Sequence, residues 1–160
     1  MNCGILKRSA ILPLFRRSVR YMNEPTKSGT PPSVEGIVSR LSPFSVDETL
    51  ERLQEAIHSR NLNIFAYINH SGEAKRVGLK MQEAHVLIFG NPKGGTPLMI
   101  ASPLLALDLP LKVLVWQSQD NRVWVSSTSV AYLKDRYALP QELVGNISGV
   151  DALIEQTLQS

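Results

Sequence analysis

The chain has 160 residues, of which 43% are hydrophobic, with 17 basic side chains, 14 acidic side chains and a single cysteine. This length and composition indicate one globular domain with a core, and they exclude collagen-like, coiled-coil and disulfide-rich proteins. The most apolar stretch, Leu98 to Leu111, is shorter than the about 20 residues of a transmembrane helix and contains Asp108 and two prolines. No membrane insertion is therefore expected.

The positive charge is concentrated at the N-terminus. Residues 1–23 contain basic and no acidic side chains, and they mix Ile, Leu, Phe and Ser. This composition is typical of a mitochondrial transit peptide. The apolar run Ala10–Phe15 is too short for a secretory signal peptide, whose core has about 7–15 residues. We expect a mitochondrial protein, or a cytoplasmic one if residues 1–23 are only a basic tail.

The folded domain is expected to begin after a linker. Residues 24–33 (EPTKSGTPPS) are rich in Pro, Gly, Ser and Thr and predict a disordered linker, which leaves residues 34–160 as a single domain. The 137 residues after the leader carry 12 basic and 14 acidic side chains, so nucleic-acid binding is not expected. Cys3 lies in the leader, which excludes a disulfide, a cysteine nucleophile or a cysteine zinc site from the domain.

Apolar periodicity predicts the elements of the domain. The helix after Ser45 begins with a capping box formed with Glu48, and alternation in the second strand places Ile64, Ile68 and His70 on one face. A turn is expected at Ser71–Glu73. In chain order, the expected elements are a strand at 34–41, a helix at 46–60, strands at 62–70 and 85–89, a short helix at 97–102, strands at 112–117 and 122–126, and helices at 130–137 and 147–158.

This element order predicts the fold class. Neighbouring strands joined by a hairpin at residues 119–121 indicate an α+β fold with a mainly antiparallel sheet of four to five strands and helices packed on one face. The run HVLIF at residues 85–89 predicts a strand covered on both faces. Trp116 and Trp124 should form a packing pair across the hairpin, and a stacking platform for a nucleic-acid base is the alternative.

Three segments resemble one known family. They are FAYINHSGEAKRVGL (65–79), LIFGNPKGGTPLM (87–99) and LDLPLKVLVWQ (107–117), and the similarity runs from about Ser39 to Tyr137. The chain resembles the family called "domain of unknown function 302". The resemblance implies a TATA-binding-protein-like α+β fold of β-α-β4-α outline and assembly into homodimers. It implies no chemistry, because the biochemical function of the family is not established.

Most positions typical of that family are present. Asn69 stands where an acidic residue is common, and Ser126 and Ser127 stand where the family often has an aromatic side chain. The first departure argues against an Asp–His pair at His70. The typical positions found here are His70, Gly78, Gly90, Asn91, Pro92, Gly95, Thr96, Pro97, Leu98, Pro110, Lys112 and Trp116.

The segment Gly90–Met99 is the main candidate site. It is expected to be a glycine-rich loop that leads into a helix capped by Thr96, with Pro97 at the first helical position. Backbone N–H groups before such a helix, aided by a lysine, can hold a small anion. The same residues also suit an ordinary strand-to-helix turn. The expected ligand-binding residues are Gly90, Asn91, Lys93, Gly94, Gly95, Thr96 and Lys112.

His70 and Lys112 are the candidate catalytic residues. His70 ends a strand, where it either completes the core rim or acts as a base near the Gly90 loop. Lys112 lies in a strand, where it either stays at the surface or points into a pocket. His58 and His85 have no metal-ligand spacing to His70, so no metal site is expected. No pattern identifies a cofactor.

Three functions remain open at this stage. The first is non-catalytic binding of a small anionic ligand or a protein partner at the Gly90–Met99 segment. The second is an enzyme that acts on a small acidic or carbonyl substrate, with His70 as base and Lys112 or Lys93 stabilising charge. The third is a structural or regulatory dimeric module. The first two require that His70, Asn91, Lys93, Thr96 and Lys112 converge on one concavity.

Overall fold

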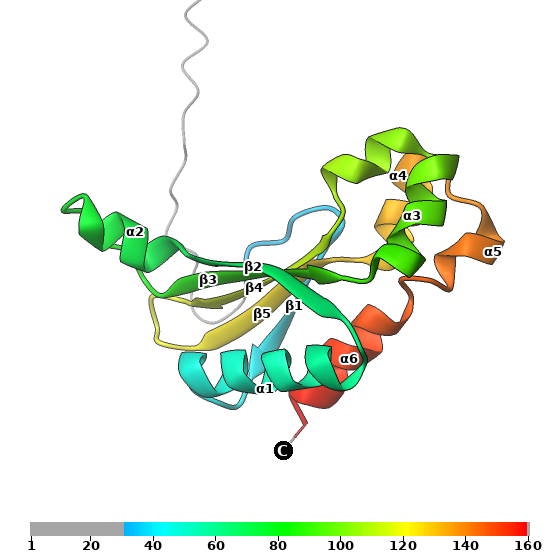
Figure 1. The fold of residues 1–160 in the computed structure, drawn as a ribbon. Coiled ribbons are helices and arrows are strands. Elements are labelled where there is room, and N and C mark those ends of the chain that lie inside the picture. The colour runs from blue at the N-terminus through cyan, green and yellow to red at the C-terminus, as the bar shows by residue number, and fades with distance from the viewer. Residues whose placement is uncertain (1–30, 160) are drawn as a thin grey trace, which may run out of the picture.

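The computed structural model describes residues 31–159 of the chain (Figure 1). The predicted transit peptide and most of the predicted linker lie outside the described residues. The elements, in chain order, are β1 (Ile37–Ser42), α1 (Val46–Ser59), β2 (Asn63–Asn69), α2 (His70–Arg76), β3 (Ala84–Gly90), α3 (Pro92–Ala101), the 3-10 helix η1 (Pro103–Leu107), β4 (Leu111–Gln117), β5 (Val123–Thr128), α4 (Val130–Tyr137), α5 (Gln141–Val144) and α6 (Gly149–Thr157).

The five strands form one antiparallel sheet in the order β1-β5-β4-β3-β2, which confirms the expected α+β class. Helices α1 and α6 lie side by side under one face of this sheet, and α3, α4 and α5 gather at one end (Figure 1). The core lies between the sheet and these two helices, and Leu53 of α1, Phe89 of β3 and Ile154 of α6 are completely buried in it.

The second face of the sheet carries no helix along its length (Figure 1). Strand β3 shows the difference between the faces, because Leu87 is fully buried while its neighbours Val86 and Ile88 are only partly buried. The expectation that this strand is covered on both faces thus holds fully for the core face and only in part for the second face. Trp116 and Trp124 pack on this second face as directly opposed residues, with their rings 6.4 Å apart, as expected.

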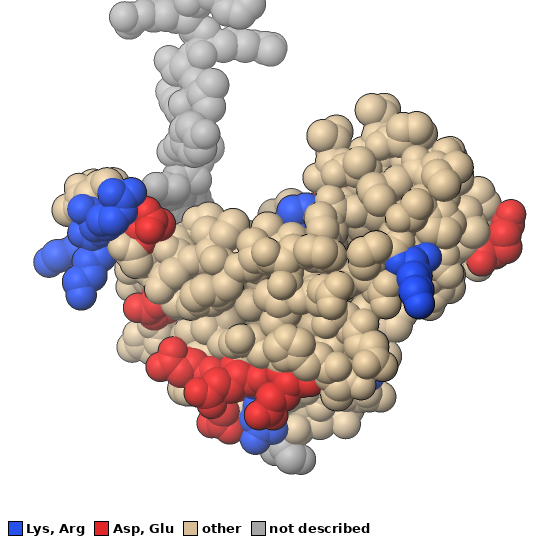
Figure 2. Space-filling view, viewed as in Figure 1, with Lys and Arg blue, Asp and Glu red and all other residues tan. Residues whose placement is uncertain are grey.

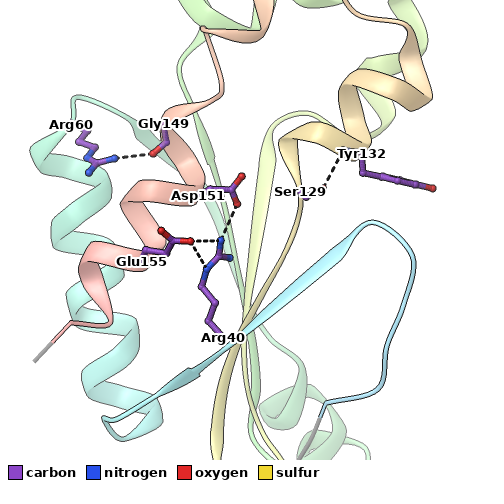
Figure 3. A network of polar contacts seen from close by, with 7 residues as sticks. All are labelled: Arg40, Arg60, Ser129, Tyr132, Gly149, Asp151 and Glu155. Carbon is purple, nitrogen blue, oxygen red and sulfur yellow. Dashed lines mark hydrogen bonds and ion pairs between the residues drawn. The ribbon is translucent and has the colours of Figure 1, made fainter.

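Side-chain caps fix the starts of two helices, and one of them is half of the capping box predicted at Ser45, because the Glu48 carboxylate pairs with Arg52 instead of returning to Ser45. The hydroxyl of Ser45 accepts a hydrogen bond from the backbone N–H of Glu48 at 3.2 Å, at the start of α1. The hydroxyl of Ser129 accepts one from Tyr132 N–H at 3.1 Å, at the start of α4 (Figure 3). Each cap satisfies a backbone donor that has no partner within its helix.

Strand β2 departs from the predicted pattern at two places. A bulge at Phe65 interrupts the register with β3, so Ile64 pairs with Phe89 on the core face while Ile68 lies on the other face. The expected turn at Ser71–Glu73 is instead helix α2, which Asn69 caps by accepting a hydrogen bond from Gly72 N–H. A strong local cap outweighs the absence of apolar periodicity in this short helix, which has no buried residue.

Two arginines attach α6 to the rest of the fold (Figure 3). Arg40 of β1 forms ion pairs with Asp151 at 3.3 Å and with Glu155 at 3.0 Å. Arg60, just after α1, donates from Nη1 to the carbonyl of Gly149 at 2.9 Å and also bonds the side chain of Gln156. The first turn of α6 is therefore held against both β1 and the end of α1.

Candidate functional site

Most of the segment Gly90–Met99 is a helix rather than a loop, because Gly90 ends β3 and α3 begins two residues later. Helix α3 begins at Pro92, and its N-cap is Asn91, whose side chain accepts a hydrogen bond from Lys93 N–H at 2.9 Å. The expected cap at Thr96 was wrong, because Asn followed by Pro is itself a strong helix start and occurs five residues earlier. Thr96 and Pro97 lie inside the helix.

The backbone amides expected to face an anion are already bonded within the protein. Gly94 N–H and Gly95 N–H both donate to the carbonyl of Asn91, at 3.0 and 2.9 Å. Gly94 has a packing role instead, since a Cβ there would lie 3.1 Å from the carbonyl oxygen of Asn146. Asn146 also donates from Nδ2 to the carbonyl of Gly94 at 3.3 Å. These contacts join α3 to the segment between α5 and α6.

The two lysines of the predicted site lie at the surface. Lys93 is exposed in the first turn of α3. Lys112 is exposed on β4, and its ammonium donates to the carbonyls of Asp108 at 3.2 Å and Pro110 at 3.4 Å. Of the two positions considered for Lys112, the structure shows the surface one.

His70 lies at the opposite end of the sheet from Gly90. It is the exposed first residue of α2, next to Asn69, which pairs with His85, whereas Gly90 pairs with Asn63. The length of β2 separates these two ends by about 20 Å at roughly 3.3 Å per residue. The expected set therefore does not converge, and a base at His70 acting beside Gly90 has no geometric support.

A cavity of about 350 Å³ nevertheless lies beside α3. It collects side chains and backbone from the end of α1, β2, the β3–α3 junction, the approach to β4 and the segment that joins α5 to α6. Four residues of the predicted site line it: Gly90, Asn91, Gly95 and Thr96. Its volume is within the range of small-molecule sites, about 300–1,000 Å³.

The wall of this cavity is mostly apolar. The apolar lining residues are Leu62, Phe65, Phe89, Pro92, Met99, Leu109, Pro110, Leu111, Ile147, Val150 and Leu153. The polar side chains are Arg60, Asn91, Thr96 and Asn146. An apolar cavity with a few polar groups suits a ligand that has an apolar body and one polar end.

Arg60 is the one charged residue that lines the cavity. Its two bonds go to a backbone carbonyl and to the amide oxygen of Gln156, and within residues 31–159 no carboxylate lies within 4 Å of it. A guanidinium has five N–H donors, so Arg60 retains capacity to bind an anion.

Four glycines line the cavity: Gly90, Gly95, Gly145 and Gly149. A Cβ at Gly145 or Gly149 would meet no atom within 4 Å, and Gly145 has a φ of −52°, which every residue type adopts. Both residues are exposed, so the space beside them opens to solvent. Backbone conformation thus does not require glycine at position 145, and a side chain can be added there.

A second polar cluster lies at the other end of β2 and β3. The hydroxyl of Tyr67 and Nδ1 of His85 are 2.7 Å apart, and Nε2 of His85 is 2.7 Å from the carboxylate of Glu83. Partial burial, with the charges of Asp47 and Glu83, raises the pKa of Tyr67. Hydrogen bonds from Ser71 and His85 hold the pKa of Glu83 below its usual value.

Two kinds of feature, a metal-ligand cluster and a membrane-spanning helix, are absent from residues 31–159. No group of three or more His, Cys, Asp or Glu side chains is placed to hold a metal ion among them. No helix in that part of the chain combines the length and the apolar character needed to cross a bilayer.

Comparison with protein families decides the relationship that the sequence motifs indicated. The family described as "Domain of unknown function DUF302" matches residues 38–159. The chain belongs to the DUF302 family. A solved structure titled "Crystal structure of uncharacterized conserved protein DUF302 from Bacillus stearothermophilus" has a similar fold, with a TM-score of 0.65 over 78% of this chain and 97% of that one. At 16% identity, this DUF302 structure supports the fold alone.

Curated relatives place a DUF302-like segment in longer chains. A protein named "Fluoride-specific ion channel FluC 1" from Brucella suis is 36% identical over 104 residues, which is 65% of this chain and 41% of that protein. The protein of the same name from Brucella abortus is 36% identical over 104 residues and is matched over 38% of its length. This chain thus spans about two fifths of the length of the curated relatives.

One wall of the cavity was not predicted from the sequence. Arg60, Gly145, Asn146 and Gly149 were not among the expected site residues. The available signal was the pair of glycines at 145 and 149 around the expected helix start at residue 147, because glycine is unfavourable in helices. Nothing in the sequence pairs that segment with Gly95.

Proposed function

We propose that this DUF302 domain is a non-catalytic binding domain for a small ligand that has an apolar body and an anionic end. The ligand occupies the cavity beside α3, with its apolar part against Phe65, Phe89 and Met99 and its anionic end at Arg60. The ligand is still a small anion at the segment Gly90–Met99, as the sequence predicts. The group that binds its negative charge is different, because it is the guanidinium of Arg60 and not the backbone amides.

The observation that carries the proposal is a cavity of about 350 Å³ whose wall is mostly apolar and whose one charged lining residue is Arg60. Arg60 has no carboxylate partner among residues 31–159, so its guanidinium retains N–H donors for an anion. A cavity with apolar walls and a few polar groups is typical of small-molecule sites.

Assembly and location are further parts of the proposal. The helix-free face of the sheet bears partly buried apolar side chains such as Val86, Ile88 and Leu114, which suit a homodimer contact. The Arg-rich leader favours a mitochondrial location, with residues 1–23 as the transit peptide. Relatives named as ion channels that contain a similar segment favour a regulatory role for ligand binding over a catalytic one.

The ligand class is tested with a series of simple amphiphiles. Hexanoate, octanoate and decanoate, each paired with the alcohol of equal length, are titrated into the purified full chain by isothermal calorimetry. Each carboxylate should bind more tightly than its alcohol, because only the carboxylate pairs with Arg60. Absence of binding for the whole series up to millimolar concentration would contradict the proposal.

A blocking variant assigns that binding to the cavity. Gly145→Leu places an isobutyl group in the open volume and should weaken octanoate binding at least tenfold. Ala131→Leu adds a comparable group to an exposed position of α4, away from the cavity, and should leave the affinity unchanged. Equal affinities for octanoate in the two variants would show that the ligand binds elsewhere.

A further inference from the structure

The segment that joins α3 to β4 has an unusual surface. From Gly94 to Leu107 the chain carries no charged side chain. Within it, the exposed residues from position 100 onwards are all apolar: Ile100, Ala101, Pro103, Leu104, Ala106 and Leu107. We call these six residues the apolar corner. The exposed fractions of Ile100, Leu104 and Leu107 are 76%, 69% and 75%, so the corner has no partner within residues 31–159.

The corner projects from the fold. Figure 1 shows α3 and the turn that follows it standing above the level of the sheet at one end of the molecule. Figure 2 shows no Lys, Arg, Asp or Glu over the top of this end. Leu105, which lies between two corner residues, is fully buried and fixes the turn to the core. The apolar side chains are therefore presented on a rigid and convex support.

We propose that the apolar corner is a membrane-docking surface, which does not span the bilayer and places Ile100, Leu104 and Leu107 against its headgroup region. A second copy of the chain suits this surface less well. Three aliphatic side chains cover on the order of 100 Å² each, whereas a stable protein interface needs about 800 Å² per partner. A bilayer accepts a few projecting apolar side chains without a complementary surface.

The charges around the corner suit an anionic lipid surface. Lys93 lies seven residues before Ile100 on α3, hence on the same side of the helix and about 10 Å from it along the axis. Within the described residues neither Lys93 nor Lys112 pairs with a carboxylate. The adjacent acid, Asp108, accepts a hydrogen bond from Tyr137 at 2.5 Å and faces Arg136 at 3.7 Å, so its charge is countered.

Vesicle binding tests this proposal with the full chain. Sedimentation with vesicles of phosphatidylcholine and phosphatidylserine, mixed 3:1, compares wild type with Leu104→Glu/Leu107→Glu. The double variant should lower the partition coefficient at least tenfold, because two carboxylates then meet the interface. The matched control is Leu79→Glu/Met81→Glu, which makes the same charge change at side chains 65% and 50% exposed beyond α2. The control should bind as wild type does.

The control also accounts for the basic leader, which all three proteins retain and which attracts anionic lipid by itself. Any one of three results would overturn the proposal. Wild type fails to bind the vesicles, the corner variant binds as wild type does, or the control variant loses binding to the same extent as the corner variant. Gel filtration supplies a further outcome, since a dimer that becomes monomeric only in the corner variant would assign the corner to a second copy instead. Circular dichroism confirms that each variant is folded.

Discussion

Arg60 and Gly149 are 89 positions apart in sequence, yet Nη1 of Arg60 donates to the carbonyl of Gly149 at 2.9 Å (Figure 3). Both residues line the cavity beside α3. This contact joins the end of α1 to the first turn of α6 and holds the guanidinium at the cavity wall. The position of the one charged lining residue is thus fixed by the packing of the two helices that cover the core.

Arg60→Gln should separate recognition of charge from recognition of the apolar body. The variant loses the cation, so octanoate affinity is expected to fall at least about tenfold, because a hydrogen bond to a charged group contributes about 1.5–3 kcal/mol. The affinity for 1-octanol should change less than twofold. Calorimetry of both ligands gives the comparison, and an equal loss for both would show that Arg60 only supports the cavity wall.

Gly94 and Gly145 should respond oppositely to alanine. A Cβ at Gly94 would lie 3.1 Å from Asn146 O, tighter than ordinary contact, so Gly94→Ala should lower the free energy of unfolding by about 1–3 kcal/mol through overpacking. Gly145→Ala meets no atom within 4 Å and should be neutral or raise stability by up to about 1 kcal/mol. Urea denaturation measures both values. Reversed signs would mean that α3 and the α5–α6 segment do not pack as described.

The ion pairs of Arg40 should contribute measurably to stability. The Arg40 side chain is only 17% exposed, and it contacts Asp151 and Glu155 on α6. Arg40→Ala is expected to cost about 1–3 kcal/mol, since charge-assisted hydrogen bonds and the packing of the arginine stem are both lost. Arg52→Ala removes an exposed pair with Glu48 within α1 and should cost less than about 1 kcal/mol. Equal losses in the two variants would contradict the anchoring role of Arg40.

Glu83 should give stability a small acid dependence. Its pKa is held below the unfolded value by hydrogen bonds from Ser71 and His85. Its contribution is therefore present above the unfolded pKa, about 4.3, and is lost as the pH falls through the lower folded pKa. Glu83→Gln should lower the melting temperature at pH 7 and approach wild type in strong acid. Glu142→Gln, at an exposed residue with no ion pair among residues 31–159, should show no such convergence.

The fold was largely predictable because its signals are local. Alternation identified β2, an unbroken apolar run identified β3, the cap at Ser45 identified α1, and the short loop between the tryptophans identified the hairpin. Helix α2 was not predictable by periodicity, since it buries no residue. The expected start of α3 at Thr96–Pro97 overlooked Asn91–Pro92, where the Asn91 side chain caps the helix and Asn146 contacts Gly94.

The candidate site was predictable only in part, and for a different reason. The residues around Gly90 were found because glycine, asparagine and proline cluster there in sequence. The opposite wall comes from Arg60 and from Gly145–Val150, which are distant in sequence and carry no motif. His70 was placed in the site because strand spacing alone does not show at which end of the sheet a residue lies.

The measurement that tests the cavity proposal most directly is an NMR titration of the ¹⁵N-labelled full chain with octanoate. The account predicts saturable shifts of the amides of Asn91, Gly95, Gly145 and Gly149, with the side-chain Nε–H of Arg60, and the same shifts should be absent in Gly145→Leu. The cavity proposal would be contradicted by shifts confined to the helix-free face of the sheet or to the apolar corner, or by shifts that persist in Gly145→Leu.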